Sequence, residues 1–117
     1  MSKKNKTQLT FGTYQQAAKE TAVYPGAYNL TYPTLGLAGE AGEVCEKVKK
    51  WIRGDYEDME REKFVEMLKK EMGDVLWYLS SIASELGIPL EDVAQVNIDK
   101  LQSRKDRNLI KGDGDDR

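Results

Sequence analysis

The sequence predicts an all-α protein with a four-helix-bundle-like fold. Apolar residues recur every three or four positions through most of the chain, which is the spacing of one helix face. No stretch alternates apolar and polar residues over the length of a strand. The 117 residues contain neither a sequence repeat nor a domain boundary. We therefore expect one domain spanning residues 1–117, with helices packed around a shared core.

The first helix is predicted over residues 10–22, after a basic arm at residues 1–9 that we expect to be flexible. Because no apolar core follows the lysines of this arm, it does not resemble a signal peptide. No apolar run reaches the length of a membrane span. The protein is therefore expected in the cytoplasm, without a membrane partner.

The second helix follows a loop at residues 24–33 that is rich in aromatic and turn residues. It is predicted to begin near Pro33, which suits a first helical turn, and to end near Ile52, before a glycine. Either Thr31 or Thr34 could cap it. Its apolar face is formed by Leu37, Ala41, Val44, Val48 and Ile52.

The third helix is predicted over residues 61–86, after a charged connector, and Gly87 ends it. Pro89 opens a fourth helix that runs to about Arg104. The remaining residues, 105–117, form a polar tail with glycines, a composition typical of a disordered end. The apolar residues expected to face inward are Phe64, Leu68, Met72, Val75, Leu79, Ile82 and Leu86 on the third helix, and Leu90, Val93 and Leu101 on the fourth.

The composition excludes several kinds of active site. There is no histidine, which rules out histidine bases, Ser–His–Asp triads and the Glu-x-x-His ligands of ferritin-like di-iron bundles. The single cysteine, Cys45, cannot form an intrachain disulfide or a multi-cysteine zinc site. A net charge of −2, from 18 basic and 20 acidic residues, is not the footprint of a nucleic-acid binder. Carboxylates remain as the main source of catalytic and metal-binding chemistry.

Two pairs of carboxylates lie on the second and third helices. Glu40 and Glu43 are three residues apart, as are Glu71 and Asp74, so each pair shares one helix surface. Either pair could be an ordinary solvated face. If the two helices pack antiparallel, however, the pairs can converge, and two carboxylates about 4 Å apart repel by roughly 4 kcal/mol at an effective dielectric near 20. Such a cluster needs protons or cations, and its hard oxygen ligands suit Mg²⁺ or Mn²⁺.

Three glycines interleave with the glutamates of the second helix. Gly36, Gly39 and Gly42 lie away from its apolar face in helical projection. Each glycine within a helix costs about 0.5–1 kcal/mol relative to alanine. Their presence therefore predicts that another backbone or a ligand approaches this side of the helix closely.

The fourth helix carries a polar stripe. Asn97, Lys100 and Arg104 follow one another at i, i+3 and i+7. Lys100 and Arg104 could bind phosphate groups, and Asn97 could bind a phosphate or a sugar. Alternatively, the stripe is a solvated basic face near a helix C-terminus, where the helix dipole favours cations.

Other candidates lie beside the carboxylates. Lys47 could pair with the neighbouring glutamates or reach a phosphate. Trp77 is three residues from an acidic residue of the third helix, Trp51 lies on the second helix, and Tyr24, Tyr28 and Tyr32 precede it. Each aromatic ring could stack on a base, or could instead belong to the core or to a subunit interface.

These features together resemble a known family. The segments GLAGEAGEVCEKVKK, EMGDVLWYLSSIASELG and NIDKLQSR, in this order, resemble the MazG-like all-α nucleoside triphosphate pyrophosphohydrolases. The resemblance covers roughly residues 28–117, and the ending K-G-x-G-D-x-R is most similar to small stand-alone members that are often phage-borne. Members often carry a further glutamate at the position that Gly39 occupies here.

The resemblance implies an activity and a set of roles. Glu40, Glu43, Glu71 and Asp74 would coordinate Mg²⁺, for which Mn²⁺ could substitute, and one of them would act as the base. A (d)NTP would be hydrolysed at its α-phosphorus to a (d)NMP and pyrophosphate, in nucleotide-pool control or house-cleaning. The polar stripe of the fourth helix would bind the substrate, and the tail could fold over it. Because the chain is small, we expect a homodimer or a homotetramer.

Two alternatives follow from the weakness of short acidic motifs. The chain could be a non-catalytic helical interaction module whose acidic faces are merely solvated. It could also be a related hydrolase of nucleoside diphosphates or of another phosphorylated metabolite. Metal binding would separate the first alternative from the main prediction, and product identity would separate the second.

Overall fold

The computed structural model describes residues 8–117 and confirms the all-α prediction. No strand occurs within this range. Residues 1–7, most of the predicted basic arm, lie outside the described residues. The elements are α1 (Phe11–Lys19), the 3₁₀ helix η1 (Gly26–Tyr28), α2 (Thr31–Arg53), α3 (Arg61–Glu85) and α4 (Leu90–Asp106).

α1 begins at a capping box and is shorter than predicted. The backbone N–H of Thr13 donates to Oγ1 of Thr10 at 3.1 Å, and the N–H of Thr10 donates to Oγ1 of Thr13 at 2.8 Å. The helix ends at Lys19, three residues before the predicted end at 22. Two residues further on, the Thr21 hydroxyl donates to the Ala18 carbonyl at 2.8 Å, a local bond that competes with continuation of the helix.

α2 begins two residues earlier than predicted. Pro33 is buried within its first turn, where a missing N–H costs nothing. Neither candidate threonine caps the helix, because Thr31 is its first residue and the Thr34 hydroxyl donates to the Leu30 carbonyl at 2.8 Å. Gly54, with φ +90°, ends the helix in the left-handed conformation, as the sequence predicted.

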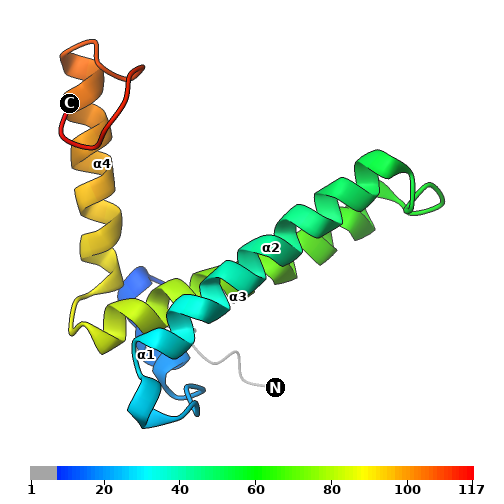
Figure 1. The fold of residues 1–117 in the computed structure, drawn as a ribbon, viewed down its shortest axis with the longest axis horizontal. Helices are drawn as coiled ribbons and strands as arrows, with labels where there is room; N and C mark the ends of the chain where they lie inside the picture. The colour runs from blue at the N-terminus through cyan, green and yellow to red at the C-terminus, as the bar shows by residue number, and fades with distance from the viewer. Residues whose placement is uncertain (1–7) are drawn as a thin grey trace.

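The four helices do not enclose one core within a single chain. Figure 1 shows α2 and α3 as a long antiparallel hairpin, with α1 packed against one end and α4 leading away from it. The radius of gyration is 17.9 Å, whereas a compact chain of this length is expected near 13 Å. The bundle of one chain is therefore open.

Gln15 of α1 ties together the region where α1, α3 and α4 meet. Its amide nitrogen donates to Oγ of Ser84 at 3.2 Å and to the Ile88 carbonyl at 3.0 Å, and its Oε1 accepts from the N–H of Leu90 at 2.8 Å. The last of these bonds satisfies a backbone donor at the start of α4. The buried apolar residues Ala18, Ala83 and Leu90 belong to the three elements that meet here, whereas the buried Phe64 stacks on Trp51 of α2.

Much of the predicted inner face is exposed. The expectation that these residues face inward is wrong within one chain, since a two-helix hairpin offers no further layer to cover them. Eight of the predicted core residues are exposed: Ala41, Val48, Ile52, Met72, Leu79, Leu86, Val93 and Leu101.

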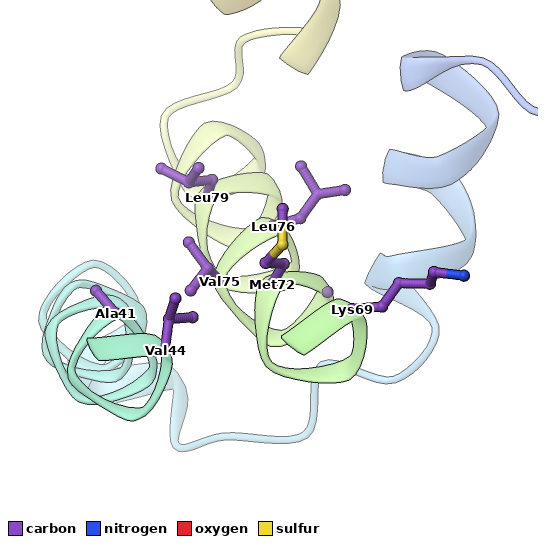
Figure 2. Close-up of a pocket in the computed structure, with 8 residues that line it drawn as sticks. Ala41, Val44, Lys69, Met72, Val75, Leu76 and Leu79 are labelled. Carbon is purple, nitrogen blue, oxygen red and sulfur yellow. The ribbon is translucent and has the colours of Figure 1, made fainter. Parts of the chain in front are cut away.

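An apolar groove runs between α2 and α3. It has a volume of about 610 Å³. Figure 2 shows Ala41 and Val44 of α2 beside Val75 and Leu79 of α3, with Met72 further along α3. The groove follows the apolar faces that the sequence assigned to the core.

Candidate functional site

Three carboxylates from two helices converge. Glu40 comes from α2, and Glu71 and Asp74 come from successive turns of α3. One oxygen from each lies within 4.8 Å of the others. The antiparallel packing of the hairpin brings them together, because residues three apart on α3 face the same part of α2.

The cluster lacks a balancing cation. Glu40 and Glu71 are half-buried and Asp74 is exposed. Burial raises the pKa of the Glu40 carboxyl above its usual range, and the negative charges of Asp74 and Glu71 raise it further. Within residues 8–117, no lysine or arginine forms a salt bridge with any of the three. Three crowded hard oxygen ligands with no protein cation are a donor set that fits Mg²⁺ or Mn²⁺.

The fourth predicted carboxylate stands beside this group. Glu43 is exposed and lies outside the three oxygens that converge. Its charge nevertheless contributes to the raised pKa of Glu40, three residues before it on α2. Of the four predicted ligands, the structure thus brings three together and leaves Glu43 at the edge.

Gly36 allows Tyr78 of α3 to pack against α2. A Cβ at Gly36 would lie 2.2 Å from the tyrosine ring, closer than any side chain tolerates. At Gly39 and Gly42, an added Cβ would meet nothing within 4 Å. A close approach is therefore confirmed at Gly36, although a side chain makes it and not the predicted backbone or ligand. The prediction is wrong within one chain at the other two glycines.

Tyr78 stands next to the carboxylates. Burial raises the pKa of its phenol, and the nearby Tyr32, Glu40 and Asp74 raise it further. Tyr14 of α1 responds in the same way, since burial and then Asp74 raise its pKa. The position of Tyr78, four residues after Asp74, was a usable sequence signal. No signal predicts Tyr14, because its proximity depends on how α1 packs against α3.

Trp77 belongs to an aromatic group next to the cluster. Its Nε1–H donates to Oγ1 of Thr21 at 2.8 Å. Its ring packs edge-on against Tyr78, with centroids 5.0 Å apart, and against Tyr24, with centroids 6.4 Å apart. Tyr24 in turn stacks on Tyr32 at 5.1 Å. Of the rings that the sequence offered as candidates for base stacking, Trp77, Tyr24 and Tyr32 therefore form one group. Trp51 instead stacks on Phe64, and Tyr28 is exposed outside the group.

The polar stripe of α4 lies elsewhere in the molecule. Figure 1 shows the C-terminal half of α4 standing away from the α2–α3 hairpin. Asn97 is exposed, Lys100 forms a salt bridge with Asp115 at 3.2 Å, and Arg104 is buried against the end of the chain. Within one chain, the structure does not join this stripe to the carboxylates.

Lys47 does not form the predicted ion pair. It is half-buried on α2, and within the described residues it makes no salt bridge with Glu40 or Glu43. The i, i+4 pair expected from spacing is therefore absent, and the ammonium group is not engaged by a carboxylate.

Across residues 8–117, no helix has the length and apolar character needed to cross a membrane.

The fold and the acidic cluster define a class of protein. The chain is all-α, and it brings Glu-x-x-Glu and Glu-x-x-Asp motifs of two helices face to face. The model of the MazG nucleotide pyrophosphohydrolase domain matches residues 31–108, two thirds of the chain, so the chain belongs to this family. The predicted family membership is confirmed.

A phage protein is similar to almost the whole chain. The "Gene 37 protein" of Mycobacterium phage L5 is 47% identical over 110 residues, which cover 89% of this chain and 96% of the phage protein. This agrees with the predicted similarity to small phage-borne members. No solved structure matches the chain.

Proposed function

We propose that this protein is a Mg²⁺-dependent pyrophosphohydrolase that converts (d)NTPs to (d)NMPs and pyrophosphate by attack of water at the α-phosphorus. The observation that carries the proposal is the convergence of Glu40, Glu71 and Asp74 in a chain of the MazG family. Because a phage protein is similar, we expect action in the cytoplasm of an infected cell. A role in nucleotide-pool control or house-cleaning would follow from the reaction itself.

The four carboxylates have two different roles in this proposal. Glu40, Glu71 and Asp74 would hold Mg²⁺, or Mn²⁺ in its place. When bound, the ion offsets the negative charge of the triphosphate and makes the attacking water more acidic. Glu43, exposed at the edge of the cluster, takes the proton from that water as general base. Water adds to the α-phosphorus as the bond to the bridging oxygen breaks, and pyrophosphate leaves.

Further groups bind the rest of the substrate. Lys100 and Arg104, which one chain does not bring to the carboxylates, would contact the phosphates from another copy of the chain, and Asn97 would contact a phosphate or the sugar. Lys47, on the same helix as Glu40, forms no salt bridge within residues 8–117, so it is available to the triphosphate. The ring of Trp77, backed by its edge-on tyrosines, offers a surface for the base.

Product analysis tests the reaction. The purified protein is incubated with each common dNTP and NTP plus Mg²⁺, and the products are separated by chromatography. We expect a monophosphate and pyrophosphate, with activity reduced at least about 100-fold in Glu43→Gln and in Asp74→Asn. The matched control is Glu46→Gln, because Glu46 is paired with Lys49 at 2.8 Å. Orthophosphate in place of pyrophosphate, or full activity in both variants, would contradict the proposal.

We further propose that two or four copies of the chain assemble through the apolar groove. The exposed Met72 and Leu79 line this groove, and the exposed Val48 continues the apolar face of α2, so an apolar surface is left without a covering layer. A second hairpin laid against the first would supply the missing layer and complete a four-helix arrangement. The open shape of the single chain, with its radius of gyration of 17.9 Å, supports the same assembly.

Light scattering after size-exclusion chromatography tests the assembly. We expect the mass of a dimer or a tetramer, and a monomer or an unfolded chain for Leu79→Glu. Val23→Glu is the matched control, because Val23 is 91% exposed and lies outside the groove. A monomeric wild-type chain at tens of micromolar would refute the assembly.

A further inference from the structure

The last nine residues form an ordered loop against α4. This tail loop, residues 109–117, reverses direction at Gly112 and Gly114, whose φ angles of +141° and +84° suit glycine. Arg117 stabilises the loop through hydrogen bonds to the backbone of the same loop. Its Nε donates to the Leu109 carbonyl at 3.1 Å, and its Nη2 donates to the Ile110 carbonyl at 2.9 Å. The disorder expected from the composition of the tail is therefore wrong.

One carboxylate of the tail loop bridges two cations of α4. Oδ1 of Asp115 lies 3.2 Å from Nζ of Lys100 and 3.4 Å from Nη2 of Arg104. The same Nη2 donates to the backbone carbonyls of Gly114 and Asp115, at 3.2 and 2.8 Å. These contacts help to bury Arg104, which is only 5% exposed. The loop thus contacts both cations of the polar stripe, and Lys100 stays partly exposed.

The loop satisfies Arg104 only in part. All its hydrogen bonds use Nη2, and the buried Nε–H has no partner within the described residues. A guanidinium binds phosphate or carboxylate best through two parallel N–H bonds, which the Asp115 carboxylate does not make. The side chain of Asp115 is 84% exposed, so solvent and salt screen its pairing with both cations. An anion with several oxygens could replace this contact and bind Arg104 more completely.

We propose that the tail loop is an internal competitor of phosphate: the Asp115 carboxylate occupies Lys100 and Arg104, and it leaves when a polyphosphate anion binds there. The proposal rests on the proposed function for its biological ligand, the triphosphate of a nucleotide. The competition itself is a binding equilibrium that requires no turnover. Because only molecules with an open loop bind the anion, the apparent affinity is the intrinsic affinity multiplied by the fraction of molecules in which the loop is open.

Binding of inorganic tripolyphosphate, measured by calorimetry without divalent cations, tests the competition. Asp115→Asn should bind tripolyphosphate roughly 1.5- to 5-fold more tightly than the wild type, the range expected from loss of exposed ion pairing. Asp116→Asn is the matched control, because it removes the same charge from the next residue, which pairs with neither cation. Equal affinities for the two variants, weaker binding by Asp115→Asn, or no binding by any of the three proteins would overturn the proposal.

Limited trypsin digestion distinguishes a displaced loop from a lid. Lys111 lies within the tail loop, so cleavage there releases residues 112–117, which mass spectrometry detects. We expect tripolyphosphate to accelerate this cleavage in the wild type and to have less effect in Asp115→Asn, where the loop is already loosened. Slower cleavage in the presence of tripolyphosphate would mean that the loop closes over the anion, which would refute competition.

The two proposals fail separately. If no nucleotide is hydrolysed but Asp115→Asn binds tripolyphosphate more tightly than Asp116→Asn, the proposed function falls and the competition stands. If nucleotides are hydrolysed and the two variants bind tripolyphosphate equally, the competition falls and the proposed function stands.

Discussion

The acidic end of the α2–α3 hairpin and the C-terminal half of α4 differ in how their charges are balanced. At the hairpin, Glu40, Glu71 and Asp74 lie together with no lysine or arginine of the described chain bonded to them. On α4, Lys100 and Arg104 already hold the carboxylate of Asp115. The first region carries charge that no cation of the described residues balances, whereas in the second a carboxylate of the same chain offsets part of the positive charge.

This difference indicates how each region meets a ligand. Binding of a cation to the acidic cluster lowers the free energy, because it relieves the repulsion among the carboxylates. Binding of an anion to Lys100 and Arg104 is less favourable, because the Asp115 carboxylate has to be displaced first. Substitutions in the acidic cluster should therefore change ligand binding more than substitutions at α4 do.

The largest expected effect is on metal binding by Asp74→Asn. Mg²⁺ should raise the melting temperature of the wild type, since it binds the folded carboxylate cluster. We expect the variant to lose more than about tenfold in Mg²⁺ affinity, because even outer partners of a metal ligand are worth 10–100-fold. In EDTA, the same variant should melt at or above the wild-type temperature, because one repelling charge is gone. Differential scanning fluorimetry with and without Mg²⁺ measures both.

The control for this experiment is Glu66→Gln, also on α3. Glu66 pairs with Lys69 at 2.7 Å and lies outside the cluster, so its Mg²⁺ response should match that of the wild type. If Asp74→Asn were destabilised in EDTA while keeping its Mg²⁺ response, the carboxylate would be a structural group and no metal ligand.

The next effect concerns the packing behind the acidic cluster. Gly36→Ala should destabilise the fold by about 1–3 kcal/mol, because the new Cβ collides with the Tyr78 ring. Gly39→Ala, one helical turn away, should instead stabilise it by about 0.5–1 kcal/mol, since nothing lies within 4 Å of the added carbon. Urea denaturation followed by circular dichroism measures both changes. Equal effects of the two substitutions would contradict the close packing of Gly36 on Tyr78.

How far the sequence predicts this protein depends on the range of the interactions involved. The helices α2 and α3 were predicted to within two residues because their apolar periodicity, Pro33 and Gly54 are local signals. The pairing of Glu40 with Glu71 and Asp74 followed from two i, i+3 motifs and one assumption about antiparallel packing. By contrast, the end of α1 was predicted three residues too late. There the Thr21 hydroxyl donates a hydrogen bond to the Ala18 carbonyl, which apolar periodicity does not reveal.

Features set by long-range packing escaped prediction. Periodicity identified Met72 and Leu79 as apolar-face residues, but it does not say whether the covering layer comes from the same chain. The ordered tail loop depends on a buried Arg104 that donates to carbonyls ten and eleven residues away, and composition alone predicts disorder there. Likewise, Gly36, Gly39 and Gly42 look alike in sequence, and only the position of Tyr78 distinguishes the first.

The smallest expected effect is on the pH dependence of folding stability, which should have opposite signs for two glutamates. Burial and neighbouring carboxylates raise the folded-state pKa of Glu40 above its ordinary value of 4.5, so the folded state binds its proton more tightly than the unfolded state does. Stability from this group is therefore present below about pH 4.5 and is lost as the pH rises through the raised pKa. In EDTA, Glu40→Gln should become progressively more stable than the wild type as the pH rises from 4 to 7. Melting temperatures across this range measure the difference.

Glu46 supplies the matched comparison on the same helix. A hydrogen bond from Lys49 lowers the pKa of its carboxyl below 4.5, so its stabilisation is present above that pH and is lost as the pH falls through the lowered pKa. Glu46→Gln should consequently be slightly less stable than the wild type at pH 7 and should approach it in acid. Two glutamates six residues apart on α2 thus respond to pH in opposite directions, because one faces other carboxylates and the other faces a lysine. Parallel pH profiles for the two variants would refute the electrostatic contrast between the acidic cluster and the rest of the hairpin.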